Sequence, residues 1–165
     1  MCKAGLTMIL LLTLMLTGAV YAQTKLSGEL KCEKGEPTYS LPVGDRPDHI
    51  FRMGKTKCTS PKPFVIEGIS SVSEDITYFA EITGNKSLAR SRSILTMSNG
   101  DKCYVGHQAN EIVKNDVFES SEVKWIITGG TGKLRGLSAK GTSKCKGAAD
   151  GTVVCAVEGE YQLKK

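Results

Sequence analysis

Histidine is scarce in this chain, and the cysteines do not form a redox motif. The 165 residues include only His49 and His107, which are far apart and lack paired ligands at the spacing of a zinc site. No two cysteines are arranged as Cys-x-x-Cys, so a thioredoxin-type active site is excluded. The sequence therefore predicts no metal, no cofactor and no catalytic residue.

Nucleotide-binding motifs are also absent, although Ile127–Gly136 is rich in glycine. A phosphate-binding loop needs glycine, four further residues and Gly-Lys-Ser/Thr, but Ile127 replaces the first glycine and Leu134 replaces the hydroxyl. The dinucleotide fingerprint fails as well, because Arg135 stands where its last glycine belongs. What remains is a glycine corner between two strand-like runs, formed by Gly129, Gly130, Gly132 and Gly136.

The chain lacks the pattern of a nucleic-acid-binding protein. Its 22 basic and 17 acidic residues give a formal net charge of +5, and the basic residues are scattered along the sequence. Aromatic residues make up only 6% of the chain and do not alternate with basic ones, as they would on a base-stacking surface. We expect no nucleic-acid partner.

Long apolar runs are missing except at the N-terminus. Lys3, the apolar stretch Leu6–Leu16 and the small residues Ala19–Ala22 have the pattern of a signal peptide cleaved after Ala22. The apolar stretch is too short for a good membrane span, so we expect an exported protein without an integral membrane segment. Residues 23–165 then form a single domain, which keeps 21 basic and 17 acidic residues.

Five cysteines remain after this cleavage, and an exported chain favours disulfides. Cys145 and Cys155 lie symmetrically about the turn of the last predicted hairpin, which favours a structural disulfide over a redox pair. Cys32 and Cys58 bracket a proline-rich segment, and a disulfide there would contribute roughly 3 kcal/mol in the chain-entropy model. Cys103 is left over as a buried free thiol.

Apolar residues alternate with a period of two, which is typical of strands. In Val153–Leu163 the odd positions are apolar or small and the even ones include Glu158 and Glu160. Asn99-Gly100 predicts a type I′ hairpin turn, and Ala148–Gly151 predicts a second hairpin corner. About eight such strands, with no convincing amphipathic helix, predict an all-β closed antiparallel barrel, since closure removes exposed edges.

Glu36–Pro63 contains all five prolines of the chain, so we expect an irregular loop there. The barrel strands offer several polar side chains that could face a cavity or solvent, and the sequence leaves both possibilities open for Tyr78, Glu81, Arg90, Arg92 and Glu122.

Cys103 and His107 share one strand face, which raises the possibility of a nucleophile and its base. Four strand positions separate them, which is ~13 Å at roughly 3.3 Å per residue, so they cannot pair. We interpret His107 as a satisfied histidine of the barrel wall or rim.

The glycine corner Ile127–Gly136 resembles that of dirigent and allene oxide cyclase-like barrels. Over Cys32–Leu163 the chain is similar to small exported bacterial proteins of unassigned function. The motifs that carry this second resemblance are Pro42–Pro47, Gly84–Ser87, Asn99–Lys102 and Glu158–Leu163. The barrel resemblance implies an eight-stranded antiparallel barrel whose mouth could hold a small ligand, and it brings no catalytic residues.

Three functions are compatible with this sequence. The first is a non-enzymatic exported barrel that binds a small apolar or amphiphilic ligand, which the absence of a nucleophile–base pair favours. The second is an isomerase or cyclase of the allene oxide cyclase kind, for which a preorganised cavity with one buried carboxylate or tyrosine would be enough. The third is a structural or interaction protein of the cell envelope that uses the proline-rich segment as its contact surface. The sequence does not indicate an oligomeric state.

Overall fold

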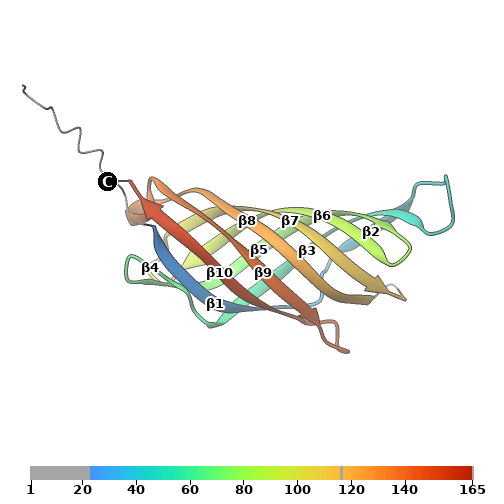
Figure 1. The fold of residues 1–165 in the computed structure, drawn as a ribbon, viewed down its shortest axis with the longest axis horizontal. Helices are drawn as coiled ribbons and strands as arrows, with labels where there is room; N and C mark the ends of the chain where they lie inside the picture. The colour runs from blue at the N-terminus through green and yellow to red at the C-terminus, as the bar shows by residue number, and fades with distance from the viewer. Residues whose placement is uncertain (1–22, 116, 165) are drawn as a thin grey trace, which may run out of the picture.

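The computed structural model describes residues 23–115 and 117–164, which form an all-β structure built around one closed barrel (Figure 1). The neighbouring strands pair antiparallel in the order β3-β1-β10-β9-β8-β7-β6-β5, and a further pairing of β5 with β3 closes the sheet. The eight barrel strands are β1 (Thr24–Cys32), β3 (His49–Lys62), β5 (Ile69–Thr83), β6 (Lys86–Met97), β7 (Lys102–Lys114), β8 (Val117–Gly130), β9 (Leu137–Gly147) and β10 (Val153–Leu163). The prediction of a closed antiparallel barrel of about eight strands is confirmed. The predicted signal peptide lies outside the described residues.

Three short elements supplement the barrel. Strand β2 (Thr38–Pro42) pairs with the N-terminal half of β3, while β4 (Val65–Ile66) forms a small hairpin with β5. A 3-10 helix, η1 (Gly132–Leu134), lies between β8 and β9, near the C-terminal end of the chain in Figure 1. Within the part of the chain that the structure describes, no helix combines the length and the apolar character that crossing a bilayer requires.

The expectation of an irregular loop over Glu36–Pro63 is wrong, because most of this segment belongs to β2 and β3. The prolines are placed where strands tolerate them. Pro42 ends β2, Pro47 lies in the turn before β3, and Pro61 sits where the register between β1 and β3 shifts. Proline cannot donate to a strand ladder, so strand ends and irregular positions are where it causes least harm. The stretch from His49 to Ser60 contains no proline and pairs continuously with β5 up to Thr59.

The hairpin at Asn99-Gly100 forms where expected, but its turn is not type I′. Gly100 has a φ of 85°, whereas Asn99 is not among the residues with positive φ. The Gly100 N–H donates to Met97 O at 2.9 Å, and the Met97 N–H donates to Asp101 O at 2.9 Å. This is a three-residue loop with glycine in the left-handed position. The Ala148–Gly151 corner repeats the pattern, with Gly151 at a φ of 84°.

Large side chains fill one half of the barrel interior. The most deeply buried of them include Ile66, Leu95, Met97, Leu134 and Leu137. The Trp125 indole on β8 extends over Gly141 on the neighbouring strand β9 and Gly159 on the next strand, β10, and a Cβ atom at either glycine would collide with its ring. The lack of a side chain at Gly141 on β9 and at Gly159 on β10 therefore makes room for the largest residue of the core.

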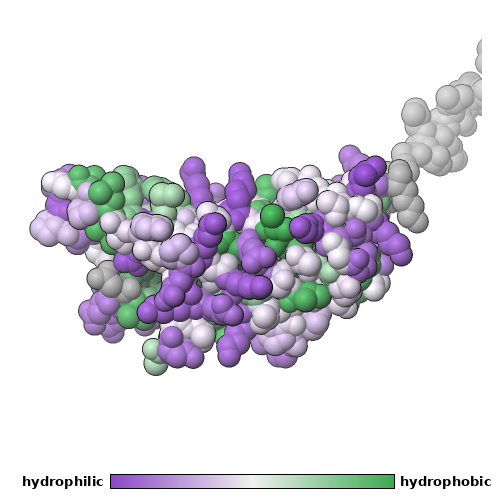
Figure 2. Space-filling model, turned by 180° about the vertical axis from the view of Figure 1, so that it is seen from behind, coloured by the Kyte–Doolittle hydropathy of each residue, from purple (hydrophilic) through white to green (hydrophobic). Residues whose placement is uncertain are grey.

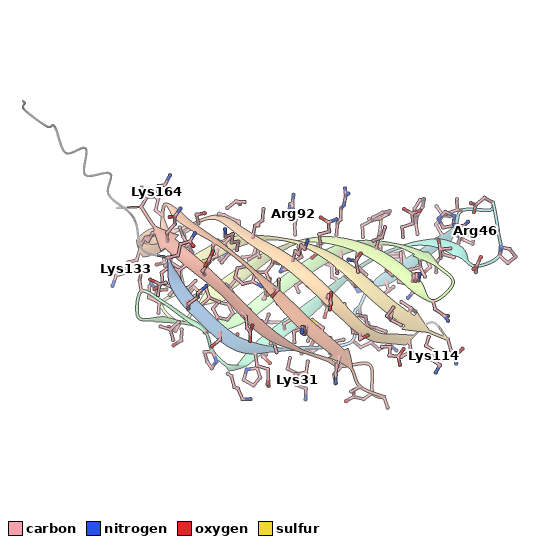
Figure 3. The ribbon with its side chains drawn as sticks, viewed as in Figure 1. Lys31, Arg46, Arg92, Lys114, Lys133 and Lys164 are labelled. Atoms are coloured by element: carbon pink, nitrogen blue, oxygen red, sulfur yellow. A yellow bond between two sulfur atoms is a disulfide. The ribbon has the colours of Figure 1, made fainter. Side chains whose placement is uncertain are left out.

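The outer surface is mainly polar, with apolar side chains distributed between charged ones (Figure 2). The labelled cations in Figure 3, among them Lys31, Arg92 and Lys114, extend away from the barrel. The most exposed large apolar residues are Tyr39 and Leu41 on β2 and Leu88 on β6.

We expect that only glycine fits at position 141, because the Trp125 indole occupies the space of a side chain there. In Gly141→Ala the new methyl group collides with the Trp125 ring and with Glu158 O, so we expect overpacking to lower the free energy of unfolding by about 1–3 kcal/mol. Gly129→Ala is the matched control, because nothing lies within 4 Å of a Cβ atom there, and we expect a change within about 0.5 kcal/mol. Urea denaturation of both variants measures the difference, and equal stabilities would contradict this account of the core.

Candidate functional site

A cavity of about 940 Å³ occupies the other half of the barrel, away from the C-terminal end of the chain. Small inward-facing residues at one level of the barrel help to leave this space open. Ala80, Ala89 and Ala109 occupy consecutive paired positions on β5, β6 and β7, so at this level three neighbouring strands present only methyl groups. The remaining wall is largely apolar and includes Leu30, Ile76, Ile82, Val113, Phe118 and Val123.

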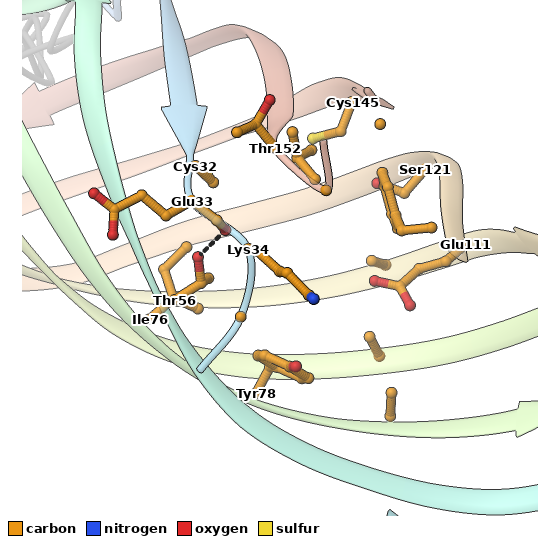
Figure 4. A pocket seen from close by; sticks show the side chains of 18 of the residues that line it. Cys32, Glu33, Lys34, Thr56, Ile76, Tyr78, Glu111, Ser121, Cys145 and Thr152 are labelled. Carbon is orange, nitrogen blue, oxygen red and sulfur yellow. Dashed lines mark hydrogen bonds between the residues drawn. The ribbon is translucent and has the colours of Figure 1, made fainter. Parts of the chain in front are cut away.

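Residues 33–37 form a strap along the cavity mouth (Figure 4). Backbone hydrogen bonds hold it to β3, with the Glu33 N–H donating to Lys57 O at 2.9 Å and the Glu36 N–H to Lys55 O at 2.8 Å. The Thr56 hydroxyl also donates to Glu33 O at 2.7 Å, which Figure 4 marks with a dashed line. The Lys34 side chain points its ammonium group into the cavity. The strap thus places a cation at the entrance.

Three polar residues, Glu74, Ser91 and His107, lie together on the cavity wall. His107 Nε2 is 3.2 Å from Glu74 Oε1, and His107 Nδ1 is 3.0 Å from Ser91 Oγ. The Ser93 hydroxyl donates to the same Glu74 oxygen. Glu74 is only 3% exposed, so its carboxylate depends on these two partners for compensation of its lost hydration. We call Glu74, Ser91 and His107 the polar cluster.

A second carboxylate, Glu111, lines the same cavity on β7. It accepts a hydrogen bond of 2.7 Å from the Ser87 hydroxyl. Burial raises the pKa of Glu111 above its ordinary value, while the Ser87 hydrogen bond and the positive charge of Arg52 oppose that rise. Arg52 also lines the cavity and donates from Nε to Ser40 Oγ at 3.3 Å.

The structure decides which of the five polar residues left open by the sequence reach the cavity. Tyr78 does, and its hydroxyl lies 3.2 Å from Thr38 Oγ1. Because the Thr38 hydroxyl already donates to Gly35 O, we assign the Tyr78 hydroxyl as the donor in this pair. The other four occupy outward strand positions, and Glu81 contacts His49 there. The four are Glu81, Arg90, Arg92 and Glu122.

Of the wall and rim positions that the sequence predicted, His107 occupies the wall, where Ser91 and Glu74 lie beside its two ring nitrogens, but sequence reasoning missed these partners. The position of Glu74 could have been predicted. Ile76, Tyr78 and Ala80 alternate along one face of their strand, and the same alternation, extended towards the N-terminus, places Glu74 on that inner face. Ser91 could be found only by pairing β6 with β7, which sets it directly opposite His107.

The structure joins Cys32 to Cys58 and Cys145 to Cys155, the pairs expected from the sequence. Two disulfides are typical of a protein from an oxidising, exported environment. Cys103 is a free, buried cysteine, and burial raises the pKa of its thiol to about 12. A thiol with that pKa is protonated at neutral pH and is a poor nucleophile.

The glycine corner lies in the half of the barrel that large side chains fill, where it leads from β8 into η1. The Asp101 carboxylate accepts a hydrogen bond of 3.0 Å from the Lys133 N–H and contacts Thr131 Oγ1 at 3.5 Å. Gly132 has a φ of 51°, and a Cβ atom there would collide with the Asp101 side chain. Leu134, fully buried, fills the adjoining core.

Within residues 23–115 and 117–164, no group of three or more His, Cys, Asp and Glu side chains is placed to hold a metal ion.

No protein-family model and no curated protein matches this chain. Among solved structures, it is similar to a crystal structure of a protein of unknown function from the DUF3224 family of Shewanella oneidensis MR-1. The two share 15% sequence identity, the alignment covers 87% of this chain and 99% of that chain, and the TM-score is 0.49. This degree of likeness does not assign a family or a role.

Outside the cavity, His49 forms a charged cluster on the outer face of β3. Its Nδ1 is 2.7 Å from Asp45 Oδ1 and its Nε2 is 2.9 Å from Glu81 Oε1. The Asp45 and Glu81 hydrogen bonds raise the pKa of His49 above its ordinary value, against smaller opposing effects of burial and of Arg46. The His49 hydrogen bond lowers the pKa of Asp45. Only the doubly protonated ring can donate to both carboxylates, so the cluster requires imidazolium.

The His49 cluster predicts a pH-dependent contribution to stability. Folding raises the pKa of His49, so protonated His49 stabilises the folded protein. This stabilisation is complete below about pH 6.5 and is lost as the pH rises through the pKa that His49 has in the folded state. The lowered pKa of Asp45 adds the opposite limit, since its contribution is present above about pH 3.9 and is lost as pH falls. We therefore expect wild type to exceed His49→Gln in urea midpoint most strongly between about pH 4 and 6.5. A difference between the two proteins that stays constant up to pH 9 would contradict this assignment.

Proposed function

We propose that the barrel binds a small amphiphilic molecule in its cavity, with an apolar body against the wall and a polar group at the polar cluster. The observation that carries this proposal is the combination of about 940 Å³ of space, a largely apolar wall and a few convergent polar side chains. Ligand pockets of about 300–1,000 Å³ with this composition are typical of small-molecule sites.

The polar cluster supports a ligand with a hydroxyl, carbonyl or carboxyl group. Ser91 and His107 both face the cavity and together offer hydrogen-bond donor and acceptor atoms. Lys34 at the entrance favours a ligand that carries negative charge or a strong dipole. The polar cluster selects for the head group, whereas the small alanine side chains leave the volume for the apolar body.

The expected signal peptide and the two disulfides support binding outside the cytoplasm. Cleavage after Ala22 would release a barrel that begins at Gln23, one residue before β1. The ligand would then be a molecule of the periplasm or the extracellular medium.

Filling the cavity is expected to abolish binding. In Ala109→Phe a ring replaces a methyl group on the inner face of β7, so it occupies the space proposed for the ligand. Titration with the fluorescent amphiphile 1-anilinonaphthalene-8-sulfonate measures the effect, and we expect the affinity to fall at least about ten-fold, or 1.4 kcal/mol.

Ala156→Phe is the matched control, because Ala156 is exposed on the outer face of β10 and the same ring leaves the cavity unchanged. Native mass spectrometry of wild type from the exported fraction provides an independent reading through any copurified small molecule. Equal affinity of both variants for the fluorophore would show that the probe binds elsewhere and would count against the proposal.

A second candidate function is isomerisation or cyclisation of a reactive apolar intermediate, as in the allene oxide cyclase kind of barrel. The buried Glu74 carboxylate is the observation that favours it, because such chemistry needs a fixed charge inside an apolar cavity. The carboxylate would stabilise positive charge that develops on the intermediate while the wall controls its conformation.

This candidate predicts that the chirality of the product depends on Glu74. With an unsaturated fatty-acid allene oxide as the probe, we expect wild type to give an enantiomeric excess of the cyclised product, and Glu74→Gln to lose most of it. The amide preserves the size of the side chain but removes its charge. Ala156→Phe should behave as wild type, and a racemic product with wild-type protein would rule out this function.

A further inference from the structure

Ser91, His107 and Glu74 come from three consecutive strands of the barrel, and their order in space is that of a nucleophile, a base and an orienting acid. Ser91 on β6 pairs directly with His107 on β7, while Glu74 on β5 reaches the other ring nitrogen of His107. All three line the cavity. Sheet closure and register fix this arrangement, because each residue occupies an inward strand position.

The neighbours of His107 determine where its proton lies. Glu74 Oε1 lies 3.2 Å from His107 Nε2, and the negative charge of a carboxylate favours a proton on that ring nitrogen. Neutral imidazole then carries a free electron pair on Nδ1, and we assign the Ser91 hydroxyl as the donor to it at 3.0 Å. The Ser91 hydroxyl is therefore directed at a base and positioned on a cavity wall.

Ser93 provides a useful contrast. Its hydroxyl donates to Glu74, and it is not among the residues lining the cavity. It therefore fixes the carboxylate that orients His107, whereas Ser91 faces the space where a substrate would sit. Of these two serines, Ser91 is the one placed for nucleophilic attack.

We propose that Ser91 is a nucleophile activated by His107, and that the cavity catalyses hydrolysis of small apolar carboxylic esters. The proposal goes beyond ligand binding and depends on the proposed function only in requiring that an apolar molecule enters the cavity. Glu74 is a positioning residue, since it acts on the substrate through His107.

The reaction has two balanced steps. Ser91 Oγ forms a bond to the ester carbonyl carbon as its proton passes to His107 Nδ1, and the carbon–oxygen bond to the alcohol breaks as that proton moves to the leaving oxygen. Water then attacks the acyl group and gives a proton to His107 Nδ1, and Ser91 Oγ leaves with that proton to release the carboxylic acid. Histidine acts as base and then as acid in each step.

The strand geometry makes covalent labelling a more direct test than turnover. Strand N–H groups are committed to the ladder between β5, β6 and β7, so they do not form a backbone oxyanion hole beside Ser91. Side-chain cations of the cavity lining, such as Lys34, are then the groups available to a developing oxyanion. A phosphonofluoridate carrying a short alkyl chain reports the activated hydroxyl directly, because Ser91 Oγ displaces fluoride at phosphorus and needs no second step.

The experiment treats the folded protein, with both disulfides intact, with this phosphonofluoridate and follows the intact mass and the labelled peptide. We expect one equivalent of label on Ser91 in wild type, none in Ser91→Ala, and labelling about a hundred-fold slower in His107→Gln. Ser27→Ala is the control variant, because Ser27 is an exposed serine on the outer face of β1, and it should label as wild type does. Wild type unfolded in guanidinium should not label.

Binding of 1-anilinonaphthalene-8-sulfonate in the same preparations separates the two proposals. Fluorophore binding without labelling of wild type would overturn the nucleophile and leave the binding function standing. Label that persists in Ser91→Ala, or an unchanged rate in His107→Gln, would also overturn it. Labelling at Ser91 that depends on His107 supports the nucleophile even where the fluorophore does not bind.

Discussion

Closure of the sheet is the constraint on which the rest of this structure depends. In a closed barrel every second side chain of every strand is directed into one shared interior, so the size of the inward residues decides how much of it is filled. Here leucine, isoleucine, methionine and tryptophan fill one half, whereas Ala80, Ala89 and Ala109 leave space at paired positions of β5, β6 and β7 in the other half. The cavity follows from residue volume at fixed strand positions and requires no special backbone feature.

Polar side chains on the inner face carry an energetic cost that the barrel offsets through pairing. An ionised or hydrogen-bonding group inside an enclosed space loses water, and the loss is tolerated when protein groups replace it. Glu74 has Ser93 and His107, and Glu111 has Ser87. Each carboxylate accepts a hydrogen bond from a serine on the adjacent strand β6, so the strand register determines which polar side chains meet.

Much of the fold could be predicted from the sequence, because alternation and turn chemistry are local. The final hairpin and the pairing of its two cysteines could be predicted from residues close together in the chain. The proline-rich segment misled the same reasoning, since prolines at strand ends and at the register shift near Pro61 look like a loop when strand pairing is unknown. The polar cluster could not be predicted from the sequence for a similar reason. His107 was identified as a wall or rim residue, but finding Ser91 and Glu74 beside it requires the register of three strands, which no local pattern records.

The positions of the disulfides follow from the same division of the interior. Three of the four bonded cysteines, Cys32, Cys145 and Cys155, line the cavity half of the barrel. Strands in that half have fewer large neighbours to pack against, so apolar burial contributes less to holding them together. Cys32–Cys58 ties β1 to β3 next to the strap, and Cys145–Cys155 ties β9 to β10 near the mouth. Covalent links limit the unfolded chain and do not occupy the interior as a hydrophobic core would. A barrel that keeps one half hollow for a ligand can therefore remain stable in an oxidising compartment without filling the space that its proposed function needs.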